Sequence, residues 1–306
     1  MAPLLSRAKK ATIIGNGNVA LDVARILLRS PNELYKTDMS LHAIEALKHS
    51  KVKHIEIVGR RGLLHAAFTN KELRELVREP HTRMLEVAPS SEMEITPTAR
   101  ADKRKLDLIK SAGKGSADGG DDDKTWQLRF LRSPQHFTSD ENGHLNSITW
   151  NINAHKDGAV VPTGASETTS TELAFTSIGY KSNQLNGLNS IGGQFDPKKH
   201  TVVRQRGKVV GTDNTFAAGW IATGPVGVIA STMMDSFSVG DEIVKYLETQ
   251  KEFKPAVQFS PELKKHLVSW DDWSKIDREE VARGEATGRP REKFTHSEDA
   301  IDWLKS

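Results

Sequence analysis

The sequence of 306 residues contains no cysteine, and this absence excludes several kinds of chemistry. Without thiols the chain can form no disulfide framework, no thiolate metal site and no redox-active dithiol. We therefore expect a reducing, or at least disulfide-independent, setting for the protein. Any redox chemistry must belong to a bound cofactor.

Other signals are missing as well. The eleven histidines are scattered, with no H-x-x-x-H or H-E-x-x-H pair, so the sequence predicts neither a metal site nor a histidine base. No G-x-S-x-G is present, which leaves hydrolase chemistry without support. No apolar run approaches the roughly 20 residues that cross a bilayer. The near balance of 43 basic and 40 acidic residues does not favour nucleic acid or a membrane as a partner.

The patterns that are present begin with a phosphate-binding motif from Ala11 to Leu28, ATIIGNGNVALDVARILL. A short apolar strand leads into a tight glycine turn, and apolar residues at helical spacing follow. Gly15 permits the turn, Gly17 lets the backbone approach a pyrophosphate, and Ala20 occupies the third small position. The phosphates would lie at the helix N-terminus, where unpaired amides and the helix dipole favour an anion. The alternative is a glycine turn in an α/β fold that binds no ligand.

A second motif, VGRRG at residues 58–62, predicts which dinucleotide is bound. It follows the strand-like run 53–58, so Arg60 and Arg61 fall at the carboxyl end of a strand, where open parallel sheets bind ligands. Two guanidinium groups can pair bidentately with a 2′-phosphate, whereas an NAD site places a carboxylate there. The pair favours NADP(H) over NAD(H), with a solvated arginine pair as the alternative. The first glycine and the arginines lie about 45 residues apart, against a usual 20 or so, because a loop and a second helical pattern at 31–50 intervene.

Beyond these motifs the chain mixes strand and helix patterns, which predicts an α/β fold. The Gly- and Asp-rich stretch 112–124 is expected to be a mobile surface loop. After about Gly179 the composition shifts to glycine turns and short strands that lead to a long apolar helix. The other expected elements are a helix from about Thr69 that ends before Pro80 and strands at 126–131, 147–152 and 172–178.

A third motif, GWIATGPVGVIASTMMDSF, covers residues 219–237. Gly224, Pro225 and Gly227 break the chain just before the apolar helix, so the backbone amides of residues 227–229 can face a ligand. A tryptophan beside such a helix start can pack on a flavin edge, while the amides hold the ribityl and pyrophosphate chain. A plain helix cap is the alternative.

Together these residues resemble the adrenodoxin reductase family of NADPH:ferredoxin oxidoreductases. The segments that carry the resemblance follow one another in the same order over nearly the whole chain: GNGNVALDVARILL, VGRRG, AAFTNKELRE, LRFLRSP, SIGYKS, GWIATGPVGVIASTMMDSF and WSKIDREEVARGEATGRPREK. The resemblance implies a flavoprotein of two domains, in which NADPH gives a hydride to FAD and FAD passes electrons singly to a small iron–sulfur ferredoxin. It implies a location on the matrix side of the mitochondrial inner membrane, although the chain shows no clear targeting peptide.

The resemblance also implies a division of the chain and a set of site residues. A Rossmann-like NADP(H)-binding domain is expected at 1–178. The C-terminal part of a second Rossmann-like domain, which binds FAD and ends in a charged extension, is expected at 179–306. The implied NADP(H) contacts are Asn16, Gly17, Asn18, Val19, Arg60, Arg61 and Glu72, and the implied FAD contacts are Trp220, Gly227, Val228 and Ile229, with Gly227 also near the nicotinamide.

Three basic residues resemble the surface that docks the acidic ferredoxin: Arg74, Lys103 and Arg104. A solvated charged face is the alternative for this cluster, and an exposed helix charge is the alternative for Glu72. No catalytic side chain is implied, because in hydride transfer between cofactors the protein stacks the rings, excludes water and tunes the potential.

The chain departs from the family's pattern at its start. Family members begin with their own strand, glycine turn and helix for the ADP part of FAD, and this chain starts at the NADP strand. Three hypotheses follow: an NADPH-dependent reductase as the full-length function, a noncatalytic NADP(H)-binding fragment, and an interaction module that holds an acidic partner. The part after about Gly179 is expected to expose some of its sheet.

Overall fold

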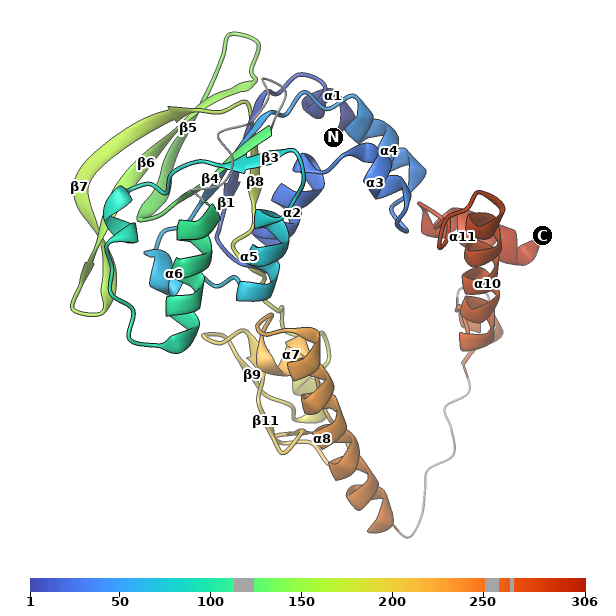
Figure 1. The fold of residues 1–306 in the computed structure, drawn as a ribbon. Helices are drawn as coiled ribbons and strands as arrows, with labels where there is room; N and C mark the ends of the chain where they lie inside the picture. The colour runs from blue at the N-terminus through green and yellow to red at the C-terminus, as the bar shows by residue number, and fades with distance from the viewer. Residues whose placement is uncertain (113–123, 251–258, 265–266) are drawn as a thin grey trace. The chain divides into compact units, whose positions relative to one another are not determined.

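The computed structural model describes residues 1–112, 124–250, 259–264 and 267–306 (Figure 1). The chain divides into two compact units, one of residues 1–178 and 267–306 and the other of residues 179–266. The C-terminal residues 267–306, expected above to belong to the second domain, group with the first unit. The expected loop at 112–124 lies almost entirely outside the described residues.

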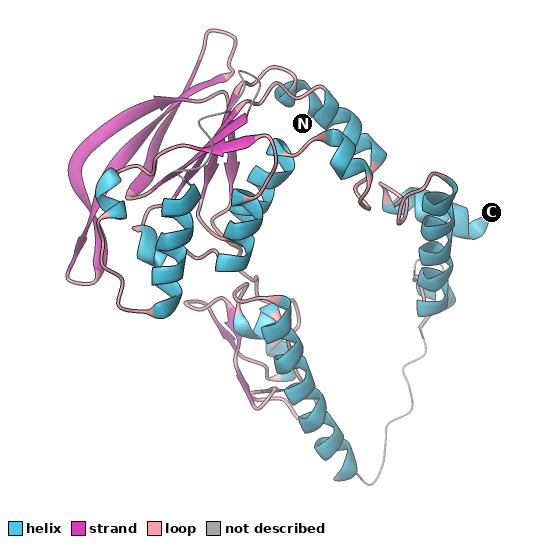
Figure 2. Ribbon diagram, viewed as in Figure 1, coloured by secondary structure: helices cyan, strands magenta, loops and turns pink. Residues whose placement is uncertain are grey.

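The first unit is built on a parallel sheet of five strands in the order β3-β4-β2-β1-β8. Figure 2 shows the strands in magenta and the helices in cyan. All four strand pairs in the five-stranded sheet are parallel. This sheet confirms the expected α/β, Rossmann-like fold. Its strands are β1 (Lys10–Ile14), β2 (His54–Val58), β3 (Thr82–Met84), β4 (Lys124–Arg129) and β8 (Leu173–Thr176).

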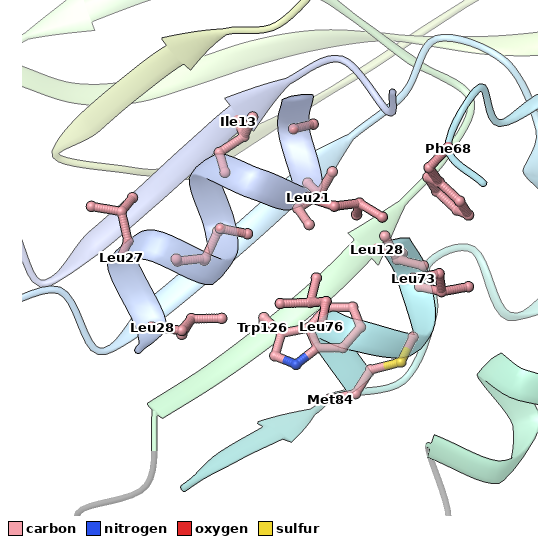
Figure 3. Close-up of a cluster of buried hydrophobic side chains, with 14 of the residues drawn as sticks. Ile13, Leu21, Leu27, Leu28, Phe68, Leu73, Leu76, Met84, Trp126 and Leu128 are labelled. Carbon is pink, nitrogen blue, oxygen red and sulfur yellow. The ribbon is translucent and has the colours of Figure 1, made fainter. Parts of the chain in front are cut away.

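Helices α2 (Asn18–Leu28) and α5 (Asn70–Val77) pack their apolar faces against this sheet (Figure 3). The expected helix start at Thr69 is confirmed, since the hydroxyl of this residue accepts the amide of Glu72 in the first turn of α5. The remaining helices of the N-terminal part are α1 (Ala2–Leu5), α3 (Pro31–Tyr35), α4 (Leu41–Lys48) and α6 (Arg100–Ala112).

Helix α6 was not expected from its charged sequence. Its buried side chains are Lys105, Leu106 and Ile109, which lie on one face of the helix. The ammonium group of Lys105 donates a hydrogen bond to the carbonyl of Ala66 at 3.1 Å and lies over the ring of Phe68. Two apolar residues and the stem of a lysine therefore suffice to bury this face.

A second sheet of three antiparallel strands is inserted between β4 and β8. It consists of β5 (Arg132–Ser139), β6 (Leu145–Lys156) and β7 (Ala159–Ser170). The strand expected at 147–152 is the central part of β6, whereas β5 and β7 were not expected. Ile148 and Trp150 of β6 are buried against Ile14 and Val58, the last residues of β1 and β2. The insertion thus packs at the carboxyl edge of the parallel sheet.

A chain of charges joins the two sheets. Glu56 is buried in β2, and its carboxylate lies 3.1 Å from Lys10 Nζ and 3.1 Å from Arg129 Nη1. Arg129 also contacts Glu167 of β7 at 2.5 Å, and Glu167 accepts a hydrogen bond from Arg132 Nε at 2.7 Å. Burial alone would raise the pKa of Glu56, but the side chain of His54, 3.9 Å away, and the charges of Arg129 and Lys10 outweigh burial and lower this pKa to about 2.

The second unit has a small core made by Leu188, Val202, Val209 and Ala217. Its long helix α8 (Ile229–Glu248) exposes large apolar side chains, among them Ile229, Met234 and Phe237. The apolar surface that this unit exposes therefore includes a helix face, where a sheet was expected. The other elements are η3 (Asn189–Ile191), β9 (Phe195–Asp196), β10 (Thr201–Val202), β11 (Arg204–Gln205), β12 (Lys208–Val209), α7 (Trp220–Thr223) and α9 (Pro261–Lys264).

The C-terminal segment carries α10 (Trp270–Ala286) and α11 (Ser297–Lys305). Arg289, between them, donates hydrogen bonds to the carbonyls of Tyr35 and Thr37 at 3.2 and 3.3 Å, and its guanidinium lies over the Tyr35 ring. Lys293 forms an ion pair with Asp38 at 2.6 Å. These contacts hold the segment against the loop between α3 and α4. Among the described helices, none is both long and apolar enough to cross a bilayer.

We expect Glu56→Gln to lower the free energy of unfolding at pH 7 by about 3 kcal/mol, because folding lowers the pKa of this carboxyl from 4.5 to about 2. The stabilisation is present above pH 4.5 and is lost as the pH falls toward 2, where the two chains should become similar in stability. Urea unfolding at pH 7 and at about pH 3 measures the difference. The same difference at both pH values would contradict a role for the carboxylate charge.

Candidate functional site

The glycine turn after β1 lies between the carboxyl ends of two neighbouring strands. Gly15 donates its amide to the carbonyl of Val58 at 2.8 Å and has a φ of +123°. A Cβ added to Gly15 would lie 2.1 Å from the carbonyl oxygen of Ser177, so only glycine fits there. Gly17 precedes α2 with no side-chain cap, and a Cβ added to it would meet nothing within 4 Å. The turn therefore leaves open space in front of the helix N-terminus.

The two asparagines of this turn hold a neighbouring loop. The carbonyl of Asn16 accepts the amides of residues 67 and 68 at 3.1 and 3.2 Å, and the side-chain oxygen of Asn18 accepts the amide of Thr69 at 2.8 Å. Val19 is exposed at the start of α2. Asn16 to Val19 thus surround the open helix start, and their contact with a pyrophosphate stays a prediction.

Arg60 and Arg61 follow β2 after one intervening residue and are exposed. Among the described residues neither guanidinium has an ion-pair partner. Their neighbour Gly59 packs on Asn16, and a Cβ at Gly59 would lie 2.3 Å from Asn16 Nδ2. This amide nitrogen is buried and has no hydrogen-bond partner within the described structure. The structure therefore brings the glycine turn into contact with residues 59–63, which we call the arginine loop.

Glu72 lies in the first turn of α5, where the positive end of the helix dipole stabilises a carboxylate. One of its carboxylate oxygens is 3.9 Å from Arg25 Nη1 on α2. The side chain is only partly exposed. The structure thus supplies a local partner for Glu72, and its contact with NADP(H) stays a prediction.

The three basic residues expected at a docking surface lie on two neighbouring helices (Figure 1). Arg74 is exposed on α5, and Lys103 and Arg104 are exposed on α6. The side-chain amide of Asn70 donates to the carbonyl of Ala101 at 3.0 Å and connects the starts of the two helices. The described residues contain no ion-pair partner for these three side chains.

In the second unit, Trp220 begins α7 with 54% of its surface exposed, and its ring stacks on Tyr180 with 6.1 Å between centroids. Gly227 has a φ of +89° just before α8. The amide of Val228 donates to Ser231 Oγ at 3.2 Å, so this amide already has a partner. Ile229 is 88% exposed. The assignment of these residues to FAD stays a prediction, and for Val228 it requires the cap to open.

The sequence analysis missed three side chains that contact the arginine loop. They are Asn153 and His155 of β6 and Glu92 of η2 (Ser90–Met93). Each is distant from the loop in sequence, so no local pattern connects them to it. Over the residues that the structure describes, no group of three or more His, Asp or Glu side chains could hold a metal ion.

The variants Gly15→Ala and Gly17→Ala form a matched pair. We expect Gly15→Ala to lower the free energy of unfolding by more than about 2 kcal/mol, because the new Cβ clashes with backbone at a positive φ. Gly17→Ala should change it by no more than about 0.5 kcal/mol, since its Cβ enters open space. Chemical denaturation measures both values. Equal losses would mean that the close approach at Gly15 is not what constrains this turn.

No family model matches the chain. The mitochondrial NADPH:adrenodoxin oxidoreductase of Bos taurus is 38% identical over an alignment of 325 positions that covers 99% of this chain and 65% of that protein. The same-named protein of Arabidopsis thaliana is 34% identical over an alignment of 332 positions that covers 98% of this chain and 67% of that protein. The chain thus spans about two thirds of the length of these curated relatives.

A solved structure has a matching fold. Mycobacterium tuberculosis FprA in complex with NADPH aligns with a TM-score of 0.84 and 31% sequence identity. The alignment covers 100% of this chain and 69% of that chain.

Proposed function

Because the chain belongs to the adrenodoxin reductase family, we propose that its first unit binds NADP(H) and that the protein acts in electron transfer from NADPH through FAD to an adrenodoxin- or ferredoxin-type iron–sulfur protein. One observation carries the NADP(H) part: two exposed arginines, which have no ion-pair partner in the described part of the chain, come after β2 and lie beside the open glycine turn that follows β1. The relatives are named as mitochondrial, and we propose the same location for this chain.

The residues of the first unit fit a dinucleotide that carries a 2′-phosphate. The uncapped start of α2 at Gly17 offers amides and the positive end of the helix dipole to a pyrophosphate. The buried Asn16 Nδ2 has no partner within the described structure and is a donor that a bound ligand can use. Arg60 and Arg61 offer planar, permanently charged forks for the 2′-phosphate.

The second unit contributes residues suited to a flavin. The exposed ring of Trp220 provides an aromatic surface, and the backbone at Gly227 turns sharply into α8. When bound, NADPH supplies the hydride and FAD accepts it. The tasks of this chain's own residues are to hold and orient the cofactors and to exclude water from them.

The second candidate function is NADP(H) binding without electron transfer. It is favoured by the amide of Val228, expected to contact FAD, because this amide already donates a hydrogen bond to Ser231 Oγ at 3.2 Å. The visible absorbance of oxidised flavin in the purified protein, together with NADPH-dependent reduction of a ferredoxin, separates the two candidates. NADPH binding without either signal would favour the second candidate.

We expect the double variant Arg60→Ala/Arg61→Ala to weaken NADPH binding by at least about 100-fold, because each charge-assisted contact to a phosphate contributes about 1.5 to 3 kcal/mol. NADH binding should hardly change, since NADH lacks the 2′-phosphate. Titration calorimetry with both cofactors measures the two affinities. Arg83→Ala, an exposed arginine on the edge strand β3, is the matched control and should bind both as the parent does. An equal loss of affinity for NADPH and NADH would contradict the assignment of the arginine pair to the 2′-phosphate.

For the partner surface, we expect charge reversal at Arg74, Lys103 and Arg104 to slow association with an acidic ferredoxin and to flatten its dependence on salt. Exposed charges act mainly by steering the encounter, so NADPH affinity should stay unchanged. Stopped-flow association at several ionic strengths measures the effect. Reversal of the exposed Lys51, which precedes β2, is the control. An unchanged rate of ferredoxin association at low ionic strength would show that the three residues form only a solvated charged face.

A further inference from the structure

The backbone of the arginine loop is held to the chain that connects the two sheets. The amide of Gly59 donates to the carbonyl of Arg129 at 2.8 Å, and the carbonyl of Gly59 accepts the amide of Arg132 at 3.1 Å. The carbonyl of Arg61 accepts the amide of Leu131 at 3.4 Å. These bonds fix one side of the loop without using any side chain.

Side chains from the inserted sheet and from η2 hold the other side. Asn153 is buried on β6, and its amide donates to the carbonyl of Arg60 at 3.1 Å. His155, two residues further along β6, accepts the amide of Gly62 at its Nε2 atom at 3.2 Å. The buried carboxylate of Glu92 accepts the amide of the next residue, Leu63.

His155 and Glu92 converge on a single backbone position. A Cβ built on Gly62 would lie 2.9 Å from His155 Nε2 and 2.7 Å from Glu92 Oε2. The ring of His155 stacks on the ring of His65, with 4.7 Å between centroids and an interplanar angle of 29°. Nε2 can accept a hydrogen bond only when the ring proton is on Nδ1. The ring is thus held by one hydrogen bond and one stacked neighbour.

The two guanidinium groups contrast with this fixed backbone. Both arginines are exposed, and neither has an ion-pair partner among the described residues. Bidentate pairing with a phosphate depends on the direction from which each guanidinium group approaches it. The Cα positions of Arg60 and Arg61 set that direction, and those positions are set by the bonds at residues 59–63.

We propose that His155 is a positioning residue for cofactor choice: by accepting the Gly62 amide it fixes the arginine loop so that Arg60 and Arg61 reach one 2′-phosphate together. Glu92 supports the same loop at Leu63. The proposal rests on the proposed role of the arginine pair in NADP(H) binding. It predicts that loss of the His155 hydrogen bond weakens the binding of NADPH and leaves the binding of NADH unchanged.

His155 suits a test because its exposed side chain can be changed without opening a core. In His155→Gln the amide oxygen can occupy the place of Nε2, whereas in His155→Asn the shorter side chain falls short of it. We expect His155→Asn to weaken NADPH binding about three- to tenfold, the range that corresponds to one neutral hydrogen bond. His155→Gln should stay within about twofold of the parent. NADH affinity should be unchanged in both variants.

A double-mutant cycle shows whether His155 acts through the arginines. In the Arg60→Ala/Arg61→Ala background, His155→Asn should cause no further loss of NADPH affinity, because no guanidinium group remains for the loop to position. A loss of the same size in that background would overturn the proposal, as would an equal loss of NADPH and NADH affinity in His155→Asn alone.

The closing measurements also separate this proposal from the function on which it rests. A parent chain that does not prefer NADPH over NADH would overturn both. A parent whose preference depends on Arg60 and Arg61, but is unchanged by His155→Asn, would overturn the positioning role alone.

Discussion

The close approach of the Gly15 backbone to its two neighbouring strands is the constraint on which the candidate site depends. Its amide donates a hydrogen bond to the carbonyl of Val58 at the end of β2. The carbonyl of Ser177, which follows β8, occupies the place that a Cβ at Gly15 would take. Ser177 in turn donates its amide to the carbonyl of Ile14 at 2.7 Å. Three strand ends are thereby tied together around one turn, and the start of α2 and the arginine loop meet at the same edge of the sheet.

The inserted antiparallel sheet supports this edge in two ways. Ile148 and Trp150 bury the last side chains of β1 and β2, so the strands that end at the site are covered there. The ion pairs from Glu56 through Arg129 to Glu167 join the two sheets at the level of the strands themselves. Because Asn153 and His155 lie on the same strand as Trp150, the packing that positions β6 also positions the contacts to the arginine loop.

Local patterns predicted the parts of the fold whose signals are local. The apolar run before Gly15 and the strand-like run before Arg60 correctly indicated two strands, because buried strands are short and rich in β-branched apolar residues. The sequence did not indicate α6, whose burial depends on Leu106, Ile109 and a lysine stem, nor β5 and β7.

The contacts made by residues distant in sequence could not be predicted in this way. The grouping of residues 267–306 with the first unit depends on Arg289, which bonds backbone carbonyls about 250 positions earlier in the chain. Carbonyl acceptors have no sequence signature. The same holds for Glu92, Asn153 and His155, each of which recognises a backbone group in the arginine loop and not a side chain.

A comparison of free energies explains why a fixed loop matters for a site that depends on arginines. Each arginine side chain loses up to about 2 kcal/mol of rotamer entropy when it is fully ordered. A charge-assisted contact to a phosphate contributes about 1.5 to 3 kcal/mol after such costs are included. If the loop backbone also had to be ordered on binding, each residue would add about 1 to 2 kcal/mol of cost, and the net preference for a 2′-phosphate would vanish. A backbone held at residues 59–63 before the ligand arrives removes that cost, which is what the proposed discrimination between cofactors by the two exposed guanidinium groups requires.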